Sequence, residues 1–534
     1  MNVIKSMFTV GGYTLLYRIT SVTRDSLQTA ILGAGPITDA FAVAFKLANL
    51  LRKLFAEGAF NAAFLPRFSG VLNKEGIGAA EILASQMLSQ LALILTIMTV
   101  ICFAGFSWII KGLAPGFAVG GLQYNYAVEL GYICFPFAIT SFIVALFGGI
   151  LNALNKFAMP AAVQLTLNIC LIIALIFGYF GAPNIGYMMA WATFLSGILQ
   201  ALILWRSVKK QGLNIKITTK KTSTETAAIM KRIVPGAVGA GVWQINVFIG
   251  CISLASFLPA GSMSYVYYTD HINQIPLGII GISLSTVLLP PLSKFLQDKN
   301  IKRANAQLNM GIIFGLSLIF PATVILTVLA EPVTAAFYGH GKFGPTQIRN
   351  AAPVLAAFAL GLPSYILTKI FSTAFFAQKN VLTPVIAGGI ALVANFVSAF
   401  CFLHTFEKIG LGHVGIAAAI STSSWVNMLV LYAVMARQKQ LRILSKSWIA
   451  CVKLLLASGI MAVSTYGMNV YAVNLYSRGV FAQAFTTVAI IVIASLIFWR
   501  MGKILGCFAV IKKYQAFTDE CVTNKKTEEQ EGHE

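Results

Sequence analysis

The sequence LALILTIMTVICFAGFSWII, residues 91–110, runs for twenty residues without a charged side chain. At about 1.5 Å per residue, a helix of this length spans the roughly 30 Å hydrocarbon core of a bilayer. Comparable apolar runs recur along the whole chain, so we expect an all-α polytopic membrane protein of about fourteen transmembrane helices. The expected spans are 3–31, 38–70, 78–112, 125–154, 160–181, 185–206, 227–256, 264–294, 303–337, 347–378, 381–404, 413–436, 446–472 and 479–504.

The composition excludes a soluble protein. Of the 534 residues, 57% are hydrophobic and only 10% are charged, whereas a soluble domain carries roughly 25% charged residues. The eight cysteines lie apart without CxxC spacing, and the five histidines do not cluster. We therefore expect no disulfide framework, no metal site and no cofactor. Arg18 and Arg24 lie in the first apolar segment, and we do not expect a removable signal peptide there.

The net charge of +22 would suggest a nucleic-acid partner in a soluble protein. In this chain many of the lysines and arginines lie in the loops between apolar segments. With a cytoplasmic N-terminus, twenty-one lysines and arginines fall in the inner loops and five in the outer loops. This asymmetry predicts a bacterial inner-membrane protein with both termini in the cytoplasm and no nucleic-acid partner.

Two matching segment pairs indicate an internal duplication. Pro66 and Pro290 close similar sequences at the ends of two segments, and Pro160 and Pro384 follow similar loops. The sequence offset is the same in both pairs, which predicts two parallel six-helix lobes of the kind found in alternating-access transporters. The expected regions are an N-lobe at 1–206, a basic cytoplasmic linker at 207–226, a C-lobe at 227–436, two further helices within 437–504 and a cytoplasmic tail at 505–534.

Charged residues concentrate in the first two apolar segments. A charge facing lipid at a helix centre costs about 2.5–3.5 kcal/mol, so these residues must pair, face a wet cavity or bind a charged ligand. Spacings of seven residues place Arg18 with Asp25 on one helix face, and Asp39, Lys46 and Lys53 on another. The surplus of positive charge suits a multivalent anion, and guanidinium groups match phosphate oxygens.

Plainer interpretations of these charges remain open. Arg52 and Lys53 can act as anchors at the end of a short helix. Arg24 and Asp25 can lie at the outer interface, and His271 beside Asp270 can be a satisfied polar pair. Lys453 fits a snorkelling anchor.

Signatures of catalysis are lacking in the sequence. It contains no Walker A loop, no HExxH and no nucleophile elbow. We therefore expect a transporter that does not hydrolyse ATP itself. An ion gradient or the membrane potential would drive it, with Asp25, Asp39, Glu57 and Asp270 as candidate coupling groups.

The same charged segments resemble the MurJ (MviN) family of lipid II flippases. The similarity covers nearly the whole chain. It is carried by Arg18, Arg24-Asp25, Gly33-Ala34-Gly35, Thr38-Asp39-Ala40-Phe41, Phe45-Lys46-Leu47, Asn49-Leu50-Leu51-Arg52, Phe55-Ala56-Glu57-Gly58, Ala114-Pro115-Gly116-Phe117, Tyr267, Asp270 and Gly341-Lys342-Phe343.

This resemblance implies the multidrug/oligosaccharidyl-lipid/polysaccharide exporter fold. It also implies a central cationic cavity for the diphosphate-disaccharide head of lipid II, and a groove at the last two helices for the polyprenyl tail. The resemblance implies that Arg18, Arg24, Arg52 and Asp39 contact the substrate. Lys46 and Glu57 would support them, and Asp270 and His271 would contribute from the C-lobe. Lipid II and membrane lipids are then the expected partners of a monomer, with the cell-wall synthesis machinery as a further partner.

Two positions depart from the family pattern. His271 stands where the family usually has an arginine, and Gln274 stands where a glutamate is frequent. The C-lobe contribution to phosphate binding is then weaker, or dependent on pH, because histidine changes charge near neutral pH.

The expected function is outward flipping of lipid II by alternating access. One alternative is a related exporter of another lipid-linked glycan or of a cationic drug. A second, from another class, is a polyprenyl-dependent membrane glycosyltransferase, which needs acidic residues in a sizeable outer loop. A third is a passive scaffold, which does not need charges within the first two segments.

Overall fold

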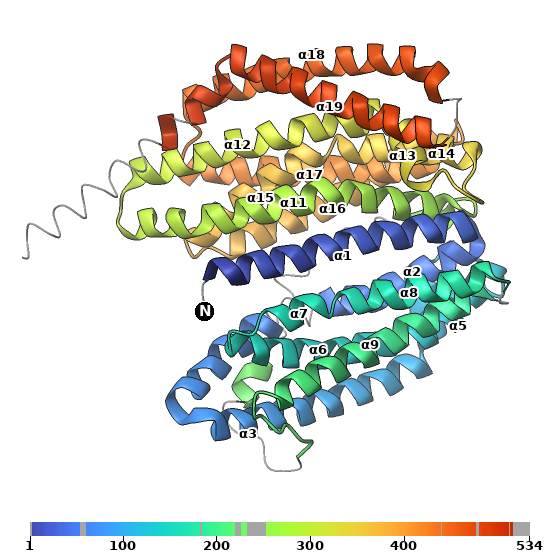
Figure 1. Cartoon of the computed structure of the whole chain (residues 1–534), viewed down its shortest axis with the longest axis vertical. Coiled ribbons are helices and arrows are strands. Elements are labelled where there is room, and N and C mark those ends of the chain that lie inside the picture. Colours follow the sequence, from blue (N-terminus) through green and yellow to red (C-terminus); the bar gives the residue numbers. More distant parts are fainter. Residues whose placement is uncertain are drawn as a thin grey trace, which may run out of the picture. The chain divides into compact units, whose positions relative to one another are not determined.

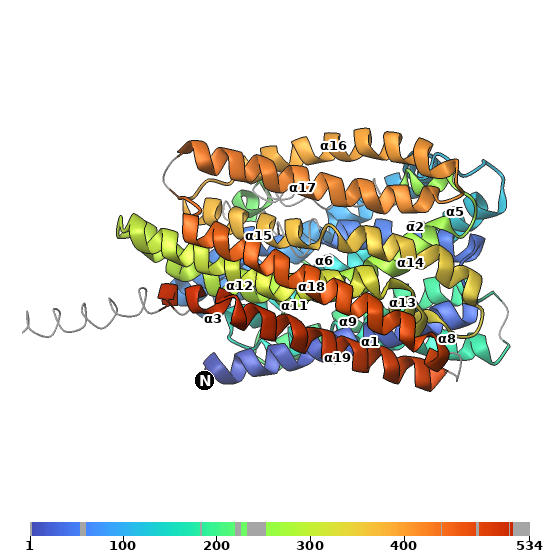
Figure 2. The same cartoon turned by 90° about the horizontal axis from the view of Figure 1, so that it is seen from above.

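The computed structural model describes residues 3–53, 60–181, 184–218, 226–231, 252–438, 441–476, 480–511 and 513–515. Every regular element in these ranges is a helix (Figures 1 and 2). The chain packs as two compact units. Unit 1 comprises Met1–Ser264 with His340–Gly344, and unit 2 comprises Tyr265–Gly339 with Pro345–Glu534.

Unit 1 is built around a bundle in which α2 packs on α5, α6 on α9, and α8 on both α1 and α9. Its core includes three side chains stacked along the start of α3, Phe60, Phe64 and Phe68. The helices are α1 (Val3–Leu32), α2 (Pro36–Leu51), α3 (Asn61–Ala104), α4 (Phe106–Leu113), α5 (Leu122–Cys134), α6 (Pro136–Ala153), α7 (Ala158–Ala162), α8 (Leu165–Tyr179) and α9 (Ile185–Lys209).

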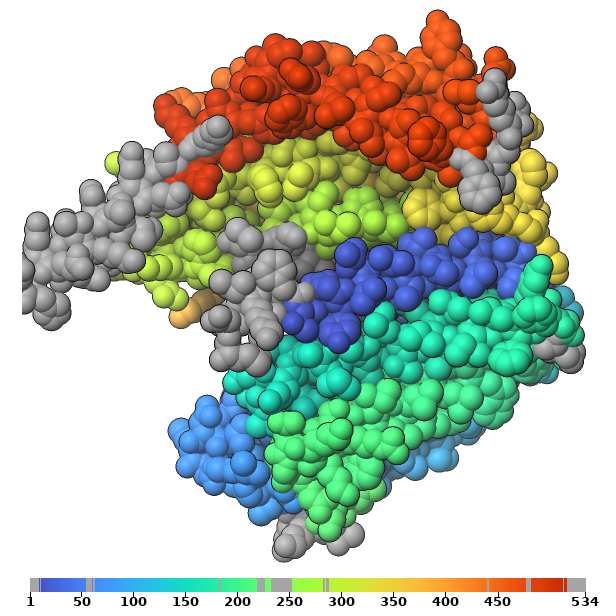
Figure 3. Space-filling model, in the orientation of Figure 1, coloured from blue at the N-terminus to red at the C-terminus, as the bar shows by residue number. Residues whose placement is uncertain are grey.

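Unit 2 contains most of α11, whose first residues belong to unit 1. Helices α18 and α19 pack on each other and on α12, and their side chains form a continuous outer surface in Figure 3. The helices are α11 (Ser262–Gln297), α12 (Ile301–Val328), α13 (Ala330–Tyr338), α14 (Pro345–Ala359), α15 (Leu362–Ala377), α16 (Leu382–Glu407), α17 (Gly412–Gln438), α18 (Ser445–Tyr476) and α19 (Val480–Ile504).

The predicted membrane class is confirmed. Ten helices in the described ranges are long and apolar enough to cross a bilayer, and large apolar side chains such as Val463 and Phe485 lie exposed on them. The chain is a multi-pass membrane protein. The count of fourteen stays a prediction, and most of the expected span 227–256 lies outside the described residues.

The boundaries of the second and third spans differ from those expected. The span expected at 38–70 is divided between α2 and the first part of α3. Gly76 then interrupts α3 with a φ of 84°, a conformation that favours glycine because it has no Cβ. The span expected at 78–112 is the remainder of α3 followed by α4.

Helix ends repeat at the offset predicted from the proline pairs. Helices α3 and α12 end at positions 104 and 328, and the next helices begin at 106 and 330. Helices α6 and α15 end at 153 and 377, and the next begin at 158 and 382. The internal duplication predicted from two proline pairs therefore extends to whole elements.

The turn after α6 has the same geometry as the turn after α15. Asn155 and Lys379, which are related by this offset, adopt left-handed φ values of 58° and 61°. In each turn the next amide donates to a carbonyl five residues back, from Lys156 to Leu151 at 2.8 Å and from Asn380 to Phe375 at 2.9 Å. This pattern is the Schellman closure of a helix end.

An extended strap, residues 213–218, follows α9 within the region predicted as a cytoplasmic linker. Leu213 and Ile215 are buried in the core of unit 1. The alternate backbone amides of the strap donate to side chains of α3, from Asn214 to Glu81 at 3.0 Å, from Lys216 to Ser85 at 3.3 Å and from Thr218 to Ser89 at 2.7 Å. Four helical residues rise about 6 Å and two extended residues about 6.6 Å, so the two registers match.

Unit 2 repeats this arrangement after α17. The Arg442 amide donates to Asn305 at 2.5 Å and the Leu444 amide donates to Asn309 at 2.9 Å. The helix positions 81 and 305, and 85 and 309, are related by the same offset as the proline pairs, whereas the strap positions 214 and 442 are slightly further apart. The second copy is therefore a little longer between the helix and its strap. The predicted lobe limits at 206, 227 and 436 stay a prediction.

Candidate functional site

A buried ion pair lies in the second half of α1. The Arg24 guanidinium donates to Asp25 Oδ1 from Nε at 2.9 Å and from Nη2 at 2.5 Å. Its Nη1 donates to Asn168 Oδ1 of α8 at 3.0 Å. Arg24 is 4% exposed and Asp25 is 2% exposed. A buried guanidinium needs a counter-ion and hydrogen-bond acceptors. Asp25 supplies the opposite charge for Arg24, and the Asn168 amide supplies a further acceptor.

Asn168 ties this pair to the backbone of α1. Its Nδ2 donates to the Tyr17 carbonyl at 3.2 Å and to the Thr20 hydroxyl at 3.1 Å. Asn168 is fully buried. Asn168 was not among the site residues predicted from the sequence, although an amide side chain within an apolar span is a signal that could have identified it.

Arg18 differs from Arg24. Its side chain is half-buried on α1, and it forms no hydrogen bond or ion pair with any other residue that the structure describes. Asp25, predicted to share a helix face with Arg18, pairs with its neighbour Arg24. Arg18 is therefore the guanidinium of α1 that is available for an anion.

Asp39 is an anchor for the start of α11. Its Oδ2 accepts from the Gly261 amide at 2.7 Å and from Gln123 Nε2 at 3.1 Å. Its Oδ1 accepts from the Ser264 amide at 2.8 Å and from the Ser264 hydroxyl at 2.5 Å. A buried carboxylate beside free amides of a helix N-terminus is a favourable arrangement. All four residues belong to unit 1.

The loop His340–Gly344 is a second late segment that packs in unit 1. The Lys342 amide donates to the carbonyl of Ala30 near the end of α1, at 2.9 Å. Gly341 has a φ of 59°, and a Cβ on it would lie 2.2 Å from that carbonyl oxygen. We call the contacts of Asp39 with Gly261 and Ser264, and of Ala30 with Lys342, the α1–α2 latch.

The basic residues of α2 lie further along that helix. Arg52 is half-buried and donates to Asn49 Oδ1 from Nε at 2.9 Å and from Nη2 at 2.7 Å. Lys46 is half-buried and Lys53 is exposed. Glu57, expected to support them, lies outside the described residues.

Asp270 and His271 lie on α11 in unit 2. Asp270 Oδ1 accepts from Gln274 Nε2 at 3.3 Å, and the His271 ring lies 4.4 Å from the Tyr267 ring. Gln274, noted above as a departure from the family pattern, is thus a hydrogen-bond partner of Asp270. A glutamate there would place a second carboxylate beside the first.

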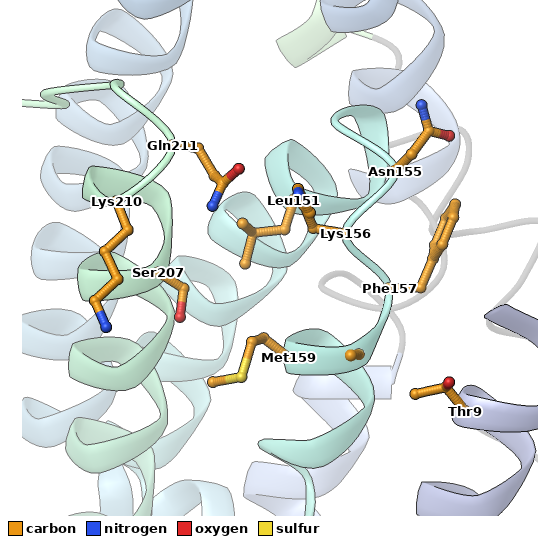
Figure 4. Close-up of a pocket in the computed structure, with 10 residues that line it drawn as sticks. Thr9, Leu151, Asn155, Lys156, Phe157, Met159, Ser207, Lys210 and Gln211 are labelled. Atoms are coloured by element: carbon orange, nitrogen blue, oxygen red, sulfur yellow. The ribbon is translucent and has the colours of Figure 1, made fainter. Parts of the chain in front are cut away.

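Unit 1 also contains a cavity of about 360 Å³. Figure 4 shows its lining, which comes from the start of α1, the turn between α6 and α7, and the end of α9. The lining residues are Thr9, Leu151, Asn155, Lys156, Phe157, Ala158, Met159, Ser207, Lys210 and Gln211.

Known proteins are similar to this chain over most of its length. The family profile described as "Lipid II flippase MurJ" matches residues 29–506. A "Probable lipid II flippase MurJ" of Rhizobium meliloti (strain 1021) is 32% identical over 474 residues, which cover 87% of this chain and 86% of that protein. The "Lipid II flippase MurJ" of Burkholderia cenocepacia is 33% identical over 442 residues, covering 81% and 83%.

Solved structures of membrane transporters are also similar to this chain. A structure titled "Lipid II flippase MurJ, inward closed conformation" is similar with a TM-score of 0.74 at 26% identity, covering 92% of this chain and 98% of that one. An inward-facing multidrug resistance MATE family transporter of the MOP superfamily has a TM-score of 0.67 at 15% identity, covering 79% and 94%. The second similarity concerns the fold alone.

Proposed function

The chain belongs to the MurJ family of lipid II flippases, and from that premise we propose that it moves lipid II from the inner to the outer leaflet of the bacterial cytoplasmic membrane. The observation that supports this most strongly is the family match over residues 29–506, which runs from the end of α1 to the end of α19. We also propose that the protein is a transporter and not an enzyme, and that both of its termini lie in the cytoplasm. It would act as a monomer, beside the cell-wall synthesis machinery.

In the proposed mechanism, Arg18 contacts the diphosphate directly. Arg18 is half-buried without a partner among the described residues, and a guanidinium matches two phosphate oxygens at once. Arg52 and Lys46 add positive charge, with Glu57 supporting them and Asp270 and His271 contributing from the second lobe. Arg24 acts through its pairing with Asp25 and Asn168, which keeps α1 in place beside α8.

Alternating access requires that some contacts break in each cycle. We propose that the α1–α2 latch is one such set, since its hydrogen bonds join the end of α1 and the start of α2 to segments that come much later in the chain. In the proposed orientation α1 begins in the cytoplasm, so the latch lies at the outer end. Opening outward would separate Asp39 from Ser264.

We further propose that α18 and α19 hold the polyprenyl tail. Apolar side chains cover them, and several are more than half exposed, including Val463, Tyr471 and Phe485. An exposed apolar face of this kind is compatible with a lipid chain lying along it.

The test is the exposure of lipid II at the outer surface of cells depleted of their own flippase. The wild-type chain should restore exposure, and Arg18→Ala should lose most of it. Arg18→Lys should retain part of the exposure, because lysine keeps the positive charge but lacks the paired N–H donors of a guanidinium. Lys408→Ala, at an exposed position, is the matched control. If a well-expressed wild type fails, an exporter of another lipid-linked glycan becomes the better assignment. If Arg18→Ala works as well as wild type, the direct role of Arg18 is wrong.

A further inference from the structure

The cavity of Figure 4 lies where several helices of unit 1 begin or end. Thr9 is close to the start of α1, Asn155 follows α6, and Lys210 follows α9. The basic cluster that begins at Arg206 marks this end as the cytoplasmic end in the predicted topology. Lys209 lies 5.6 Å from the Trp205 ring, and tryptophan beside a basic residue is typical of the membrane interface.

Among the residues that the structure describes, two lysines, Lys156 and Lys210, line this cavity, and no acidic residue does. The side chains of Lys156 and Lys210 form no hydrogen bond or ion pair with other residues in the described ranges. Ser207 and Gln211 add neutral donors on the same side as Lys210. The cavity therefore presents uncompensated positive charge together with hydrogen-bond donors, which favours an anionic oxygen ligand.

The turn itself does not need Lys156. At the equivalent turn of unit 2, the Asn380 side chain accepts from the Thr383 amide at 3.1 Å and donates to the Thr383 hydroxyl at 2.8 Å. Lys156 and Met159 hold the equivalent positions of unit 1 and form no such pair. Since both turns close through the same backbone hydrogen bonds, the lysine is free for another role.

One wall of the cavity is apolar. Leu151, Phe157 and Met159 line it, and Met159 is 39% exposed. A free inorganic anion has no apolar part that could contact these side chains. A lipid places its phosphate at the membrane interface and its acyl chains in the hydrocarbon core, so it can contact both the lysines and the apolar wall. The volume of about 360 Å³ falls at the lower end of the roughly 300–1,000 Å³ range of ligand pockets.

We propose that this cavity binds the phosphate headgroup of an anionic glycerophospholipid from the cytoplasmic leaflet, with Lys156 and Lys210 as its charged contacts. Basic pockets between membrane helices at the cytoplasmic side commonly bind such headgroups. The site is separate from the diphosphate contacts proposed on α1 and α2, and its occupancy does not depend on lipid II transport.

The test is native mass spectrometry of the full-length protein released from vesicles of phosphatidylcholine with increasing phosphatidylglycerol. We expect wild type to retain phosphatidylglycerol in preference to phosphatidylcholine. The double variant Lys156→Gln/Lys210→Gln should bind it roughly thirtyfold more weakly, from the attraction that each lysine adds near the surface. Lys74→Gln/Lys216→Gln removes the same charge from exposed positions outside the cavity and should leave binding unchanged.

Three results would overturn the proposal. Equal losses in both double variants would mean that the lipid responds only to overall charge. Inorganic phosphate that competes as effectively as phosphatidylglycerol would make this a site for a free anion. A wild type without preference for phosphatidylglycerol would leave the cavity with no anionic lipid ligand. Circular dichroism and membrane levels of each variant, matched to wild type, exclude a loss of folding as the cause.

Discussion

Asp39 on α2 accepts hydrogen bonds from both the backbone amide and the hydroxyl of Ser264, a residue 225 positions later in the chain. Asp39 is 1% exposed, so its charge is stabilised by these donors and not by water. Two further donors, Gly261 and Gln123, complete its shell. A carboxylate with four donors fixes the start of α11 within unit 1, and it leaves little capacity for a substrate group in this conformation.

The first prediction concerns this anchor. Asp39→Asn removes the charge and replaces one acceptor by a donor, so about 1–3 kcal/mol of stabilisation should be lost. Ser264→Ala removes only the hydroxyl and should cost less. Because both substitutions weaken one interaction, the double variant should resemble Asp39→Asn alone. The measurement is the Tm of the purified protein, and additive shifts would show that Asp39 and Ser264 act independently.

The buried pair on α1 gives the second prediction. Asp25→Ala leaves the Arg24 charge buried without its counter-ion, which should cost about 3–5 kcal/mol and lower the amount of folded protein. Arg24→Ala/Asp25→Ala removes both charges and should recover part of that loss. Asn168→Ala removes one hydrogen bond to Arg24 and should be milder than Asp25→Ala. Membrane levels and Tm report these effects, and a double variant worse than Asp25→Ala contradicts the pairing argument.

Gly341 gives the third prediction. A Cβ there would lie 2.2 Å from the Ala30 carbonyl oxygen, and the φ of 59° already disfavours other residues. Gly341→Ala should therefore displace the loop from α1 and cost at least about 1–3 kcal/mol. Gly459→Ala on α18, where a Cβ meets nothing within 4 Å, is the control and should be neutral. Thermal unfolding distinguishes them, and an unchanged Tm for Gly341→Ala would mean that the loop tolerates the shift.

Periodic and repeated features of the fold could be predicted from the sequence. Membrane helices follow from apolar runs, since their length is fixed by the bilayer. The pairs Pro66 with Pro290 and Pro160 with Pro384 were enough to detect an offset that the structure repeats in helix ends and in the turns at Asn155 and Lys379. The break of α3 at Gly76 falls in the polar stretch between the spans expected at 38–70 and 78–112. The left-handed φ of this glycine does not follow from the sequence, because Gly70 and Gly78 border the same stretch.

Partners of the charged residues were much harder to predict. The spacing of seven residues correctly places Arg18 and Asp25 on one helix face, yet Asp25 pairs with its neighbour Arg24, whose long side chain reaches it directly. Asn168 and Ser264 come from distant segments, so their proximity depends on how the helices pack. The sequence identified where charge concentrates, whereas the packing determines which charges are satisfied internally.

The last prediction concerns the paired straps. Asn309 on α12 is fully buried; its Oδ1 accepts from the Leu444 amide at 2.9 Å and its Nδ2 donates to the Arg442 carbonyl at 2.8 Å. Asn309→Ala removes both bonds, so the segment before α18 should open more easily, by about 1–3 kcal/mol. Ser85→Ala, at the equivalent position of unit 1, removes one bond of 3.3 Å and should have a smaller effect.

Hydrogen exchange followed by mass spectrometry measures both straps in one experiment. In Asn309→Ala, peptides that contain Arg442 and Leu444 should exchange faster, while peptides from strap 213–218 should keep the wild-type rate. In Ser85→Ala the change should be confined to strap 213–218, and modest, because Leu213 and Ile215 remain buried beside α3. Faster exchange throughout the chain in either variant would mean that these side chains support the whole fold. Local changes on the two predicted segments would establish that each copy of the duplication fastens its own strap through the same helix positions.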